Sequence, residues 1–221
     1  MYKVIEAPWV YETISAQFDA SLPLLTADAI VFGGAVRDTI AGMPLKGDMD
    51  VVVVESRFAQ LRERFEGSNK WRRKNMPRGH KPYNHPDIAG VVEYMNIYGN
   101  TVQIIQARSK PATPALVCSL AAVEHVDFIC CGIAMDYRGV IYEVVSGAFD
   151  DCVNKVLRAN GEVNDFTTFK SRLTKLKGRG WKSKVLLAAL RQTKSDKNLD
   201  KSAGKDKPQI KSMKERYNLN F

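Results

Sequence analysis

The stretch AIVFGGAVRDTIAGMPLKGDMDVVVV, residues 29–54, decides the fold of this chain. It opens with a short apolar run that ends in Gly33-Gly34, a pattern typical of a buried strand entering a tight turn. A short helix is predicted over 35–41, because a glycine and a proline follow it closely. The β-branched run 51–54 predicts a second strand directly after two aspartates.

Those two aspartates, Asp48 and Asp50, are two residues apart. Alternate residues of a strand point to the same face, so both carboxylates would converge on one point. Two hard oxygen ligands suit Mg²⁺, which completes its octahedron with water and phosphate oxygens. Two such ions can bridge a triphosphate and an attacking hydroxyl. We expect Asp48 and Asp50 to bind two Mg²⁺ ions, with Mn²⁺ as the alternative, and to be catalytic. A pair of this kind alone is also common in loops.

The Gly33-Gly34 turn would supply the phosphate contacts. A strand, a glycine turn and a helix start present backbone N–H groups that can cradle phosphate oxygens. Arg37, in the first helical turn, would contact a phosphate, or would fix Asp38 and the loop. A glycine pair by itself is more often a plain turn, so the prediction depends on its combination with the two aspartates.

Residues 31–54 closely resemble the signature of the CCA-adding enzyme and bacterial poly(A) polymerase family, within the polymerase-β-like nucleotidyltransferase superfamily. That signature is an apolar strand, GGxVRD, a short helix, and DxD at the start of an apolar strand. The resemblance continues in HVDFICCGIAMDYRGVIYEVVSGAFDDCVNKVLR, residues 125–158, and more weakly in RLTKLKGRGW, residues 172–181. The matching positions of the longer segment are Asp127-Phe128, Asp136, Gly139, Gly147, Asp150-Asp151 and Leu157-Arg158.

The resemblance implies an α+β fold: a polymerase-β-like head with a mixed sheet and flanking helices, followed by a short basic helical segment. It implies a metal-dependent enzyme that transfers a nucleoside monophosphate from a nucleoside triphosphate to an acceptor, with the 3′-hydroxyl of RNA, tRNA included, favoured. The nucleotide-binding residues implied by the match are Gly33, Gly34, Arg37, Asp38, Asp127 and Arg158.

Gln103 is the main departure from the family pattern. The family carries a third catalytic carboxylate on a later strand, and Gln103 occupies the matching position in VQIIQAR, residues 102–108. An amide oxygen can ligate a metal weakly, but it is neither a base nor an anion. Glu93 on the neighbouring strand could substitute if the hairpin loop holds an odd number of residues, because only then would it share a face with Gln103.

Two further departures concern the bases and the RNA. His125 and Val126 replace two family arginines, and the base-selecting EDxxR element has no clean counterpart, the nearest stretch being 164–169. The family's RNA-gripping domains have no room after Trp181. Two alternatives therefore stay open: a nucleotide- or RNA-binding module of the same fold with weakened catalysis, and a transferase whose acceptor is a protein or a small molecule.

Positive charge is concentrated near the C-terminus. The net charge is +9, and residues 170–221 hold 16 Lys and Arg against 4 Asp and Glu. This asymmetry favours a polyanionic partner, RNA first, although a solvated tail would look the same. The predicted nucleic-acid-binding residues are Arg72, Arg73, Lys170, Arg172, Lys175, Lys177, Arg179, Lys182 and Lys184.

We predict three regions: a nucleotidyltransferase head over 1–160, a basic helical segment over 161–192 and a flexible basic tail over 193–221. No run of about 20 apolar residues and no secretory signal is present, and the four cysteines have no zinc spacing, which favours a cytoplasmic protein with reduced, buried thiols and no membrane contact. No protein partner is indicated. The remaining predictions are a hairpin over 91–97 and 101–106, extended segments over 128–135 and 140–145, helices over 58–65, 113–123, 166–176 and 181–191, and a loop over 68–87.

Overall fold

A computed structural model describes residues 3–18, 29–45, 48–74, 88–108, 126–161 and 166–184. The helix predicted over 113–123, most of the loop to residue 87 and the C-terminal tail lie outside these residues. Within the described part of the chain, no helix is long and apolar enough to cross a membrane.

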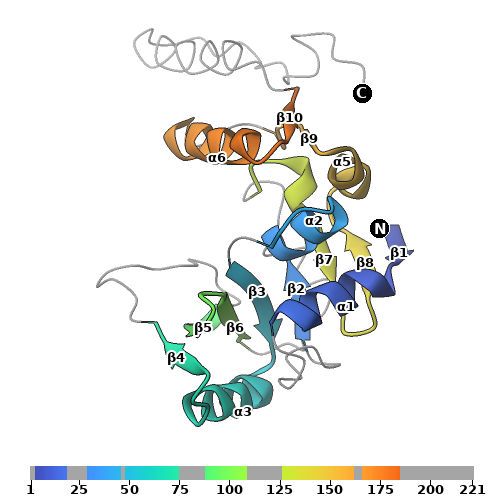
Figure 1. Ribbon diagram of the computed structural model, residues 1–221. Helices are drawn as coiled ribbons and strands as arrows, with labels where there is room; N and C mark the ends of the chain where they lie inside the picture. The colour runs from blue at the N-terminus through green and yellow to red at the C-terminus, as the bar shows by residue number, and fades with distance from the viewer. Residues whose placement is uncertain are drawn as a thin grey trace, which may run out of the picture.

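An eight-stranded mixed sheet forms the centre of the molecule (Figure 1), in the order β1-β8-β7-β2-β3-β6-β5-β4. The central β3 is antiparallel to β2 and parallel to β6. The strands are β1 (Lys3–Glu6), β2 (Ala29–Phe32), β3 (Asp48–Val53), β4 (Trp71–Arg73), β5 (Ile88–Asn96), β6 (Thr101–Ala107), β7 (Ile133–Met135) and β8 (Val140–Glu143). The predicted α+β class with a mixed sheet is confirmed.

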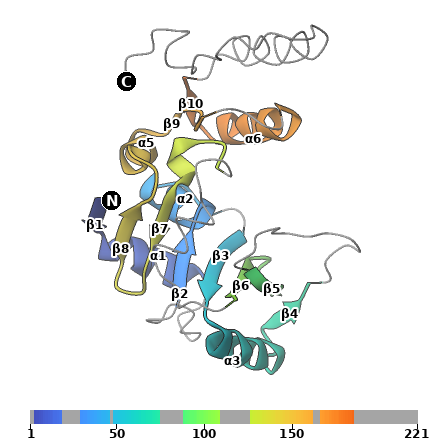
Figure 2. The same cartoon turned by 180° about the vertical axis from the view of Figure 1, so that it is seen from behind.

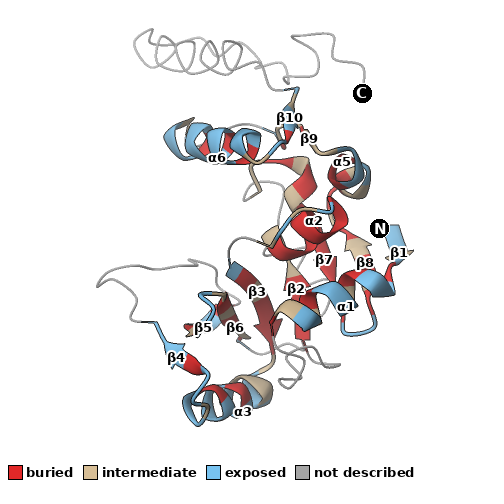
Figure 3. Ribbon diagram, viewed as in Figure 1, coloured by how far each residue is buried: buried red, intermediate tan, exposed pale blue. Residues whose placement is uncertain are grey.

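Helices cover one face of this sheet. They are α1 (Pro8–Gln17), α2 (Gly34–Ile40) and α3 (Glu55–Glu66). Each helix contributes at least two apolar side chains to the main core cluster, where they pack with side chains of the strands. The helix residues include Val10, Ile14, Val36, Ile40, Leu61 and Phe65, and the strand residues include Val31, Val51 and Ile104. Alternate residues of the same strands, such as Ile30, Val52 and Ile105, form a second cluster on the opposite face. The strands at the centre of the sheet are buried along almost their whole length (Figure 3).

The remaining elements lie beyond the end of the sheet that carries α2. They are the 3₁₀ turn η1 (Ile129–Cys131), α5 (Ala148–Asn154), β9 (Val156–Leu157), α6 (Phe166–Gly178) and β10 (Lys182–Ser183). Both views place α6, β9 and β10 at one end of the molecule and α3 at the other (Figures 1 and 2). Phe169 of α6 packs on Phe128, with 4.8 Å between ring centroids, so α6 shares the core of the head.

Three sequence predictions are corrected by the structure. Trp71–Arg73, predicted as loop, forms β4, because Trp71 packs into the core and the strand pairs with β5. The extended segment predicted over 128–135 is interrupted by η1. The helix predicted from Trp181 is replaced at its start by β10, which pairs in parallel with β9 after Gly180 turns the chain at φ +90°.

Two segments that were not predicted from the sequence complete the sheet and the head. Strand β1 pairs with β8 and becomes the edge of the sheet, and α1 follows it directly. The amide of Ala7 donates to Gly139 O at 3.0 Å, and a Cβ on Gly139 would lie 2.6 Å from Pro8 Cα. This close approach requires glycine in the β7–β8 turn.

Phe65 of α3 packs against Trp71 of β4 and Tyr94 of β5. Removing its ring therefore tests whether β4 is packed into the core. Its ring lies 4.8 Å from that of Trp71 and 4.7 Å from that of Tyr94, and it is fully buried. We expect Phe65→Ala to lower the free energy of unfolding by about 3–5 kcal/mol, because it leaves a cavity. Urea denaturation measures this, and a loss below about 1 kcal/mol would contradict the packing.

Candidate active site

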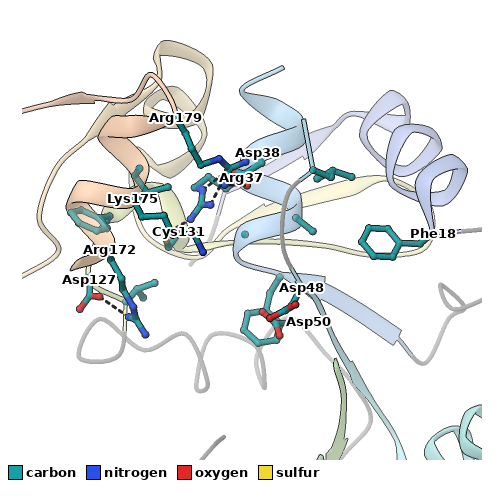
Figure 4. Close-up of a pocket in the computed structure, with 17 residues that line it drawn as sticks. Phe18, Arg37, Asp38, Asp48, Asp50, Asp127, Cys131, Arg172, Lys175 and Arg179 are labelled. Carbon is teal, nitrogen blue, oxygen red and sulfur yellow. Dashed lines mark hydrogen bonds and ion pairs between the residues drawn. The ribbon is translucent and has the colours of Figure 1, made fainter. Parts of the chain in front are cut away.

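A cleft of about 350 Å³ opens between α2, the start of β3 and α6 (Figure 4). Four segments that are far apart in the sequence meet here. The lining residues are Phe18, Phe32, Gly34, Ala35, Arg37, Asp38, Leu45, Asp48, Asp50, Val126, Asp127, Phe128, Cys131, Arg172, Lys175, Leu176 and Arg179. The structure therefore brings together the two predicted metal ligands, part of the predicted phosphate turn and three of the predicted basic residues.

Asp48 and Asp50 lie side by side at the cleft (Figure 4). Asp48 is exposed and Asp50 is half-buried, whereas Met49 between them is buried in the core. The alternation of the strand thus separates an acidic face from an apolar one, as the spacing predicted.

Gln103 is the direct neighbour of Asp50 in the parallel β3–β6 pair, and Glu93 is the direct neighbour of Gln103 in the β5–β6 pair. The hairpin pairs Met95 with Thr101, which leaves an odd number of loop residues, so Glu93 and Gln103 share the face of Asp50. Glu93 is buried and forms an ion pair with Lys74.

The donor set of Asp48 and Asp50 fits Mg²⁺ or Mn²⁺. Among the described residues, no three His, Cys, Asp or Glu side chains are grouped closely enough to hold a metal by themselves. A closed site for a tetrahedral metal such as Zn²⁺ is therefore absent from this part of the chain. Mg²⁺ needs only one or two carboxylates, because water and substrate phosphates supply its other ligands.

Gly33 and Gly34 form the turn between β2 and α2. Gly33 has φ +70°, which favours glycine, and its amide donates to Ile133 O at 3.0 Å. The amide of Arg37 donates to Gly33 O at 3.0 Å, as the first intrahelical bond of α2. The amides of Gly34 and Ala35 precede that bond, so they have no acceptor within the helix, and both residues line the cleft.

Arg37 and Asp38 form a buried cluster with Arg179. Asp38 accepts from Arg37 Nε at 2.8 Å and pairs with Arg179 Nη1 at 2.8 Å. Arg37 also donates to Cys131 Sγ at 3.2 Å and lies 5.6 Å from the centre of the Trp181 ring. Of the two roles predicted for Arg37, the structure shows the pairing with Asp38, and the phosphate contact stays a prediction. The cluster also ties α2 to the chain just after α6.

The groups of this cluster shift one another's pKa values. Burial opposes the charge on Arg37, but Cys131 and Asp38 outweigh that cost and raise its pKa. The pKa of Cys131 is lowered, first by a hydrogen bond from Cys130 and then by Arg37, which favours a thiolate. The pKa of Cys152 is raised by burial, so it stays a thiol. The sequence indicated only buried, inert cysteines; the half-buried position of Cys131 beside Arg37 had no local signal.

Arg172 and Lys175 bring positive charge to the mouth of the cleft. Arg172 Nη1 forms an ion pair with Asp127 Oδ2 at 2.6 Å. The backbone N–H of Asn160 donates a hydrogen bond to Asp127 O at 3.0 Å and so holds the chain at Asp127 in place. Lys175 is exposed and has no ion pair with any described residue. The predicted residues Asp127, Arg172 and Lys175 are therefore neighbours across this opening.

Other predicted site residues lie away from the cleft. Arg158 donates to both carboxylate oxygens of Asp151 at 2.9 Å, where it holds α5 to β9. Arg72 and Arg73 alternate along β4, so they face opposite sides of the sheet, and Arg73 pairs with Glu66 of α3 at 3.6 Å.

The remaining predicted basic residues form no single surface with the cleft. Helical spacing places Lys170 and Lys177 on the flank of α6 opposite Arg172 and Lys175. Lys182 lies on β10 and Lys184 follows it, and neither lines the cleft. The apolar walls, such as Phe18, Leu45 and Leu176, were not predicted as site residues, since apolar side chains carry no signal that separates a cleft wall from a core.

The fold of this chain is similar to that of the head of solved CCA-adding enzymes. Solved structures of CCA-adding enzymes share the fold: one in complex with CTP has a TM-score of 0.58 at 16% identity, covering 92% of this chain and 49% of that one. The Thermotoga maritima CCA-adding enzyme complexed with tRNA has a TM-score of 0.56 at 17% identity, covering 92% and 48%. This chain spans about half the length of these proteins. Its sequence matches no family model and no curated protein.

Asp38→Asn tests the buried cluster. It removes the carboxylate shared by Arg37 and Arg179 and leaves two mostly buried cations without it. We expect the free energy of unfolding to fall by about 3–5 kcal/mol, which urea denaturation measures. Asp150→Asn, at an exposed position of α5, is the matched control and should change it by about 0.5 kcal/mol or less. Equal effects of the two variants would contradict the cluster's role.

The lowered pKa of Cys131 predicts selective alkylation. Only the thiolate reacts, so the rate of iodoacetamide modification rises with pH through the pKa and then levels off. We expect Cys131 to level off at least one pH unit below an ordinary thiol, whose pKa is about 8.5. Mass spectrometry of the folded protein over a pH series measures this. Modification of Cys152 before Cys131 would contradict it.

Proposed function

We propose that this chain is a metal-dependent nucleotidyltransferase that moves a nucleoside monophosphate from a nucleoside triphosphate to an acceptor hydroxyl, with the 3′-hydroxyl of an RNA as the favoured acceptor. The observation that supports it best is the joint position of Asp48 and Asp50 opposite the first turn of α2 in one cleft. The shared fold with CCA-adding enzymes solved with CTP and with tRNA supports the same reaction class and makes tRNA the first acceptor to test.

Different residues of the cleft would contact the phosphates, contact the base or acceptor, and hold these groups in position. The backbone amides of Gly34 and Ala35 would donate to the phosphate oxygens, and Lys175 would neutralise part of the phosphate charge. Arg172 and Asp127 at the mouth would meet the base or the acceptor. Arg37, Asp38 and Arg179 would keep these groups in place without touching the reacting atoms.

The reaction that this site would carry out is an in-line displacement. The acceptor oxygen forms a bond to the α-phosphorus, the bond between that phosphorus and the bridging oxygen to the β-phosphate breaks, and pyrophosphate leaves while the hydroxyl proton passes to solvent. Divalent ions held by Asp48 and Asp50 would supply charge neutralisation for the attacking and leaving oxygens. The carboxylates would place those charges at the α-phosphate.

Gln103 favours a second candidate, a nucleotide- or RNA-binding module with weak or no turnover. It is the direct neighbour of Asp50, yet it brings no negative charge to the acidic face. Such a module would bind a Mg²⁺–triphosphate complex or RNA without forming product. A transferase with a protein or small-molecule acceptor is the third candidate, and it would show turnover without RNA.

The decisive assay offers each α-³²P-labelled nucleoside triphosphate to the full chain with RNA, with protein and without an acceptor. We expect Mg²⁺-dependent incorporation into RNA. The Asp48→Asn, Asp50→Asn double variant should lose about 1000-fold or more, because several kcal/mol of charge stabilisation in the transition state disappear.

The matched control is Asp150→Asn, which removes an exposed carboxylate outside the cleft and should retain full activity. Undiminished incorporation by the double variant would refute the proposed site. Tight nucleotide binding with no product in any acceptor arm would favour the binding module.

A further inference from the structure

Three free cysteines gather where η1 packs against α5. They are Cys130 and Cys131 of η1 and Cys152 of α5. Cys130 and Cys152 are fully buried, and the Cys152 thiol donates to Cys130 O at 3.4 Å. Cys131 is only half-buried and lines the cleft (Figure 4). A small reagent that enters the cleft therefore meets one of these three thiols and not the other two.

The sulfur of Cys131 accepts two hydrogen bonds. Arg37 Nη1 donates to it at 3.2 Å, and the thiol of Cys130 donates to it as well. The hydrogen bond from Cys130, together with the charge of Arg37, lowers the pKa of Cys131 to about 6, although burial opposes this. The same hydrogen bond raises the pKa of Cys130, and burial adds to the increase. The pair therefore consists of a thiolate on the cleft wall and a protonated thiol in contact with it.

Neither thiol has a part in the proposed transfer reaction, which needs phosphate contacts, a divalent cation and an acceptor hydroxyl. The arrangement matches the requirements of reversible thiol oxidation instead. Oxidation by peroxides selects cysteines that are both ionised and accessible, and a second thiol in contact with the first allows the product to be recovered. Among the described cysteines, Cys131 alone meets the first requirement, and Cys130 supplies the second.

We propose that Cys131 is a site of reversible oxidation, at which a peroxide forms a sulfenic acid that the Cys130 thiol converts to a disulfide, and that this modification weakens nucleotide binding in the cleft. The effect on nucleotide binding rests on the proposed function. The modification itself does not depend on it.

The chemistry proceeds in two steps. The Cys131 thiolate attacks one oxygen of hydrogen peroxide, the O–O bond breaks, and the departing hydroxide takes up a proton and leaves as water, so the sulfur is oxidised and the peroxide is reduced. The Cys130 sulfur then attacks the Cys131 sulfur and loses its proton. The S–O bond breaks, and the hydroxyl group leaves with that proton as a second molecule of water.

A disulfide between Cys130 and Cys131 would be easy to reverse. The Cα atoms of neighbouring residues are about 3.8 Å apart, whereas those of most disulfides are about 4.4–6.8 Å apart. The bond would therefore be strained, and strained disulfides are the readily reduced ones. Its formation would also protect Cys131 from further oxidation to the sulfinic acid, which is generally irreversible.

Oxidation would reach the phosphate turn through Arg37. A Cβ on Gly34 would lie 3.8 Å from Arg37 Nη2, so the guanidinium group lies directly against the turn. The disulfide offers Arg37 Nη1 no charged acceptor in place of the thiolate. We infer that the loss of this hydrogen bond loosens the turn whose Gly34 amide would donate to a phosphate.

Peroxide treatment of the full chain tests the modification, with dimedone to trap sulfenic acid and tandem mass spectrometry to locate each product. The wild type should form the Cys130–Cys131 disulfide and retain little dimedone. Cys130→Ser should hold at least about fivefold more dimedone at Cys131, because no thiol remains in contact to condense with the sulfenic acid. Cys152→Ser is the matched control, since it removes another buried thiol of the cluster, and it should behave as the wild type does.

Three results would overturn the modification. They are a dimedone increase in Cys152→Ser in place of Cys130→Ser, oxidation of another cysteine before Cys131, and a wild-type disulfide that joins Cys131 to any residue other than Cys130. Urea denaturation checks that each variant is folded. The wild-type disulfide map decides the question even where Cys130→Ser does not fold.

Equilibrium binding of the Mg²⁺ complexes of the four nucleoside triphosphates tests the link to the cleft. Affinity should fall at least about threefold after peroxide, because Arg37 loses a hydrogen bond to a charged acceptor, and dithiothreitol should restore it. Cys131→Ser should show the same affinity before and after peroxide, which excludes an effect of methionine oxidation.

The outcomes separate the inference from the proposed function. Formation of the Cys130–Cys131 disulfide with unchanged nucleotide affinity would overturn the link to the cleft. An untreated wild type that binds none of the four nucleotides would contradict the proposed function, whereas the disulfide map would still confirm or refute the oxidation site.

Discussion

One carboxylate, that of Asp38, connects two walls of the cleft. It lies between two arginines, Arg37 of its own helix and Arg179 beyond α6, so it holds a wall of the cleft that is more than 130 residues away in the sequence. Arg179 also donates to Pro44 O at 2.9 Å, which draws the loop before β3 into the same cluster. Such a buried group is costly unless all of its charges are paired, so the position of α6 is well defined.

The sheet supplies the second constraint, because register alone decides which charges meet. Asp50, Gln103 and Glu93 are scattered over 54 positions of the chain, yet they follow one another across β3, β6 and β5. A shift of one residue in the β5–β6 hairpin would turn Glu93 into the core and bring Tyr94 or Val92 to the acidic face. The five residues between the paired Met95 and Thr101 therefore control which side chains reach this face.

The sequence predicted the parts of the site that are local. Turn geometry places Gly33, and strand alternation places Asp48 and Asp50, and a short stretch of residues specifies both. The strand at Trp71 could not be predicted, because its pairing with β5 and its packing on Phe65 are long-range and outweigh its polar, basic composition. The basic run 170–184 looked uniform, but helical geometry sends Arg172 and Lys175 to the cleft and Lys170 and Lys177 to the other flank. Arg158 lies at a position that matches the family pattern, yet in the structure it forms an ion pair with Asp151 that holds α5 to β9.

The two edges of the sheet have a further consequence. An edge strand offers unpaired backbone groups to any other strand, and large sheets are vulnerable to polymerisation there. Here the edges are β1, of four residues with an exposed lysine and glutamate at its ends, and β4, of three residues with two exposed arginines. Both are too short and too charged to template a second chain. Short, charged edges of this kind oppose edge-to-edge pairing with another chain.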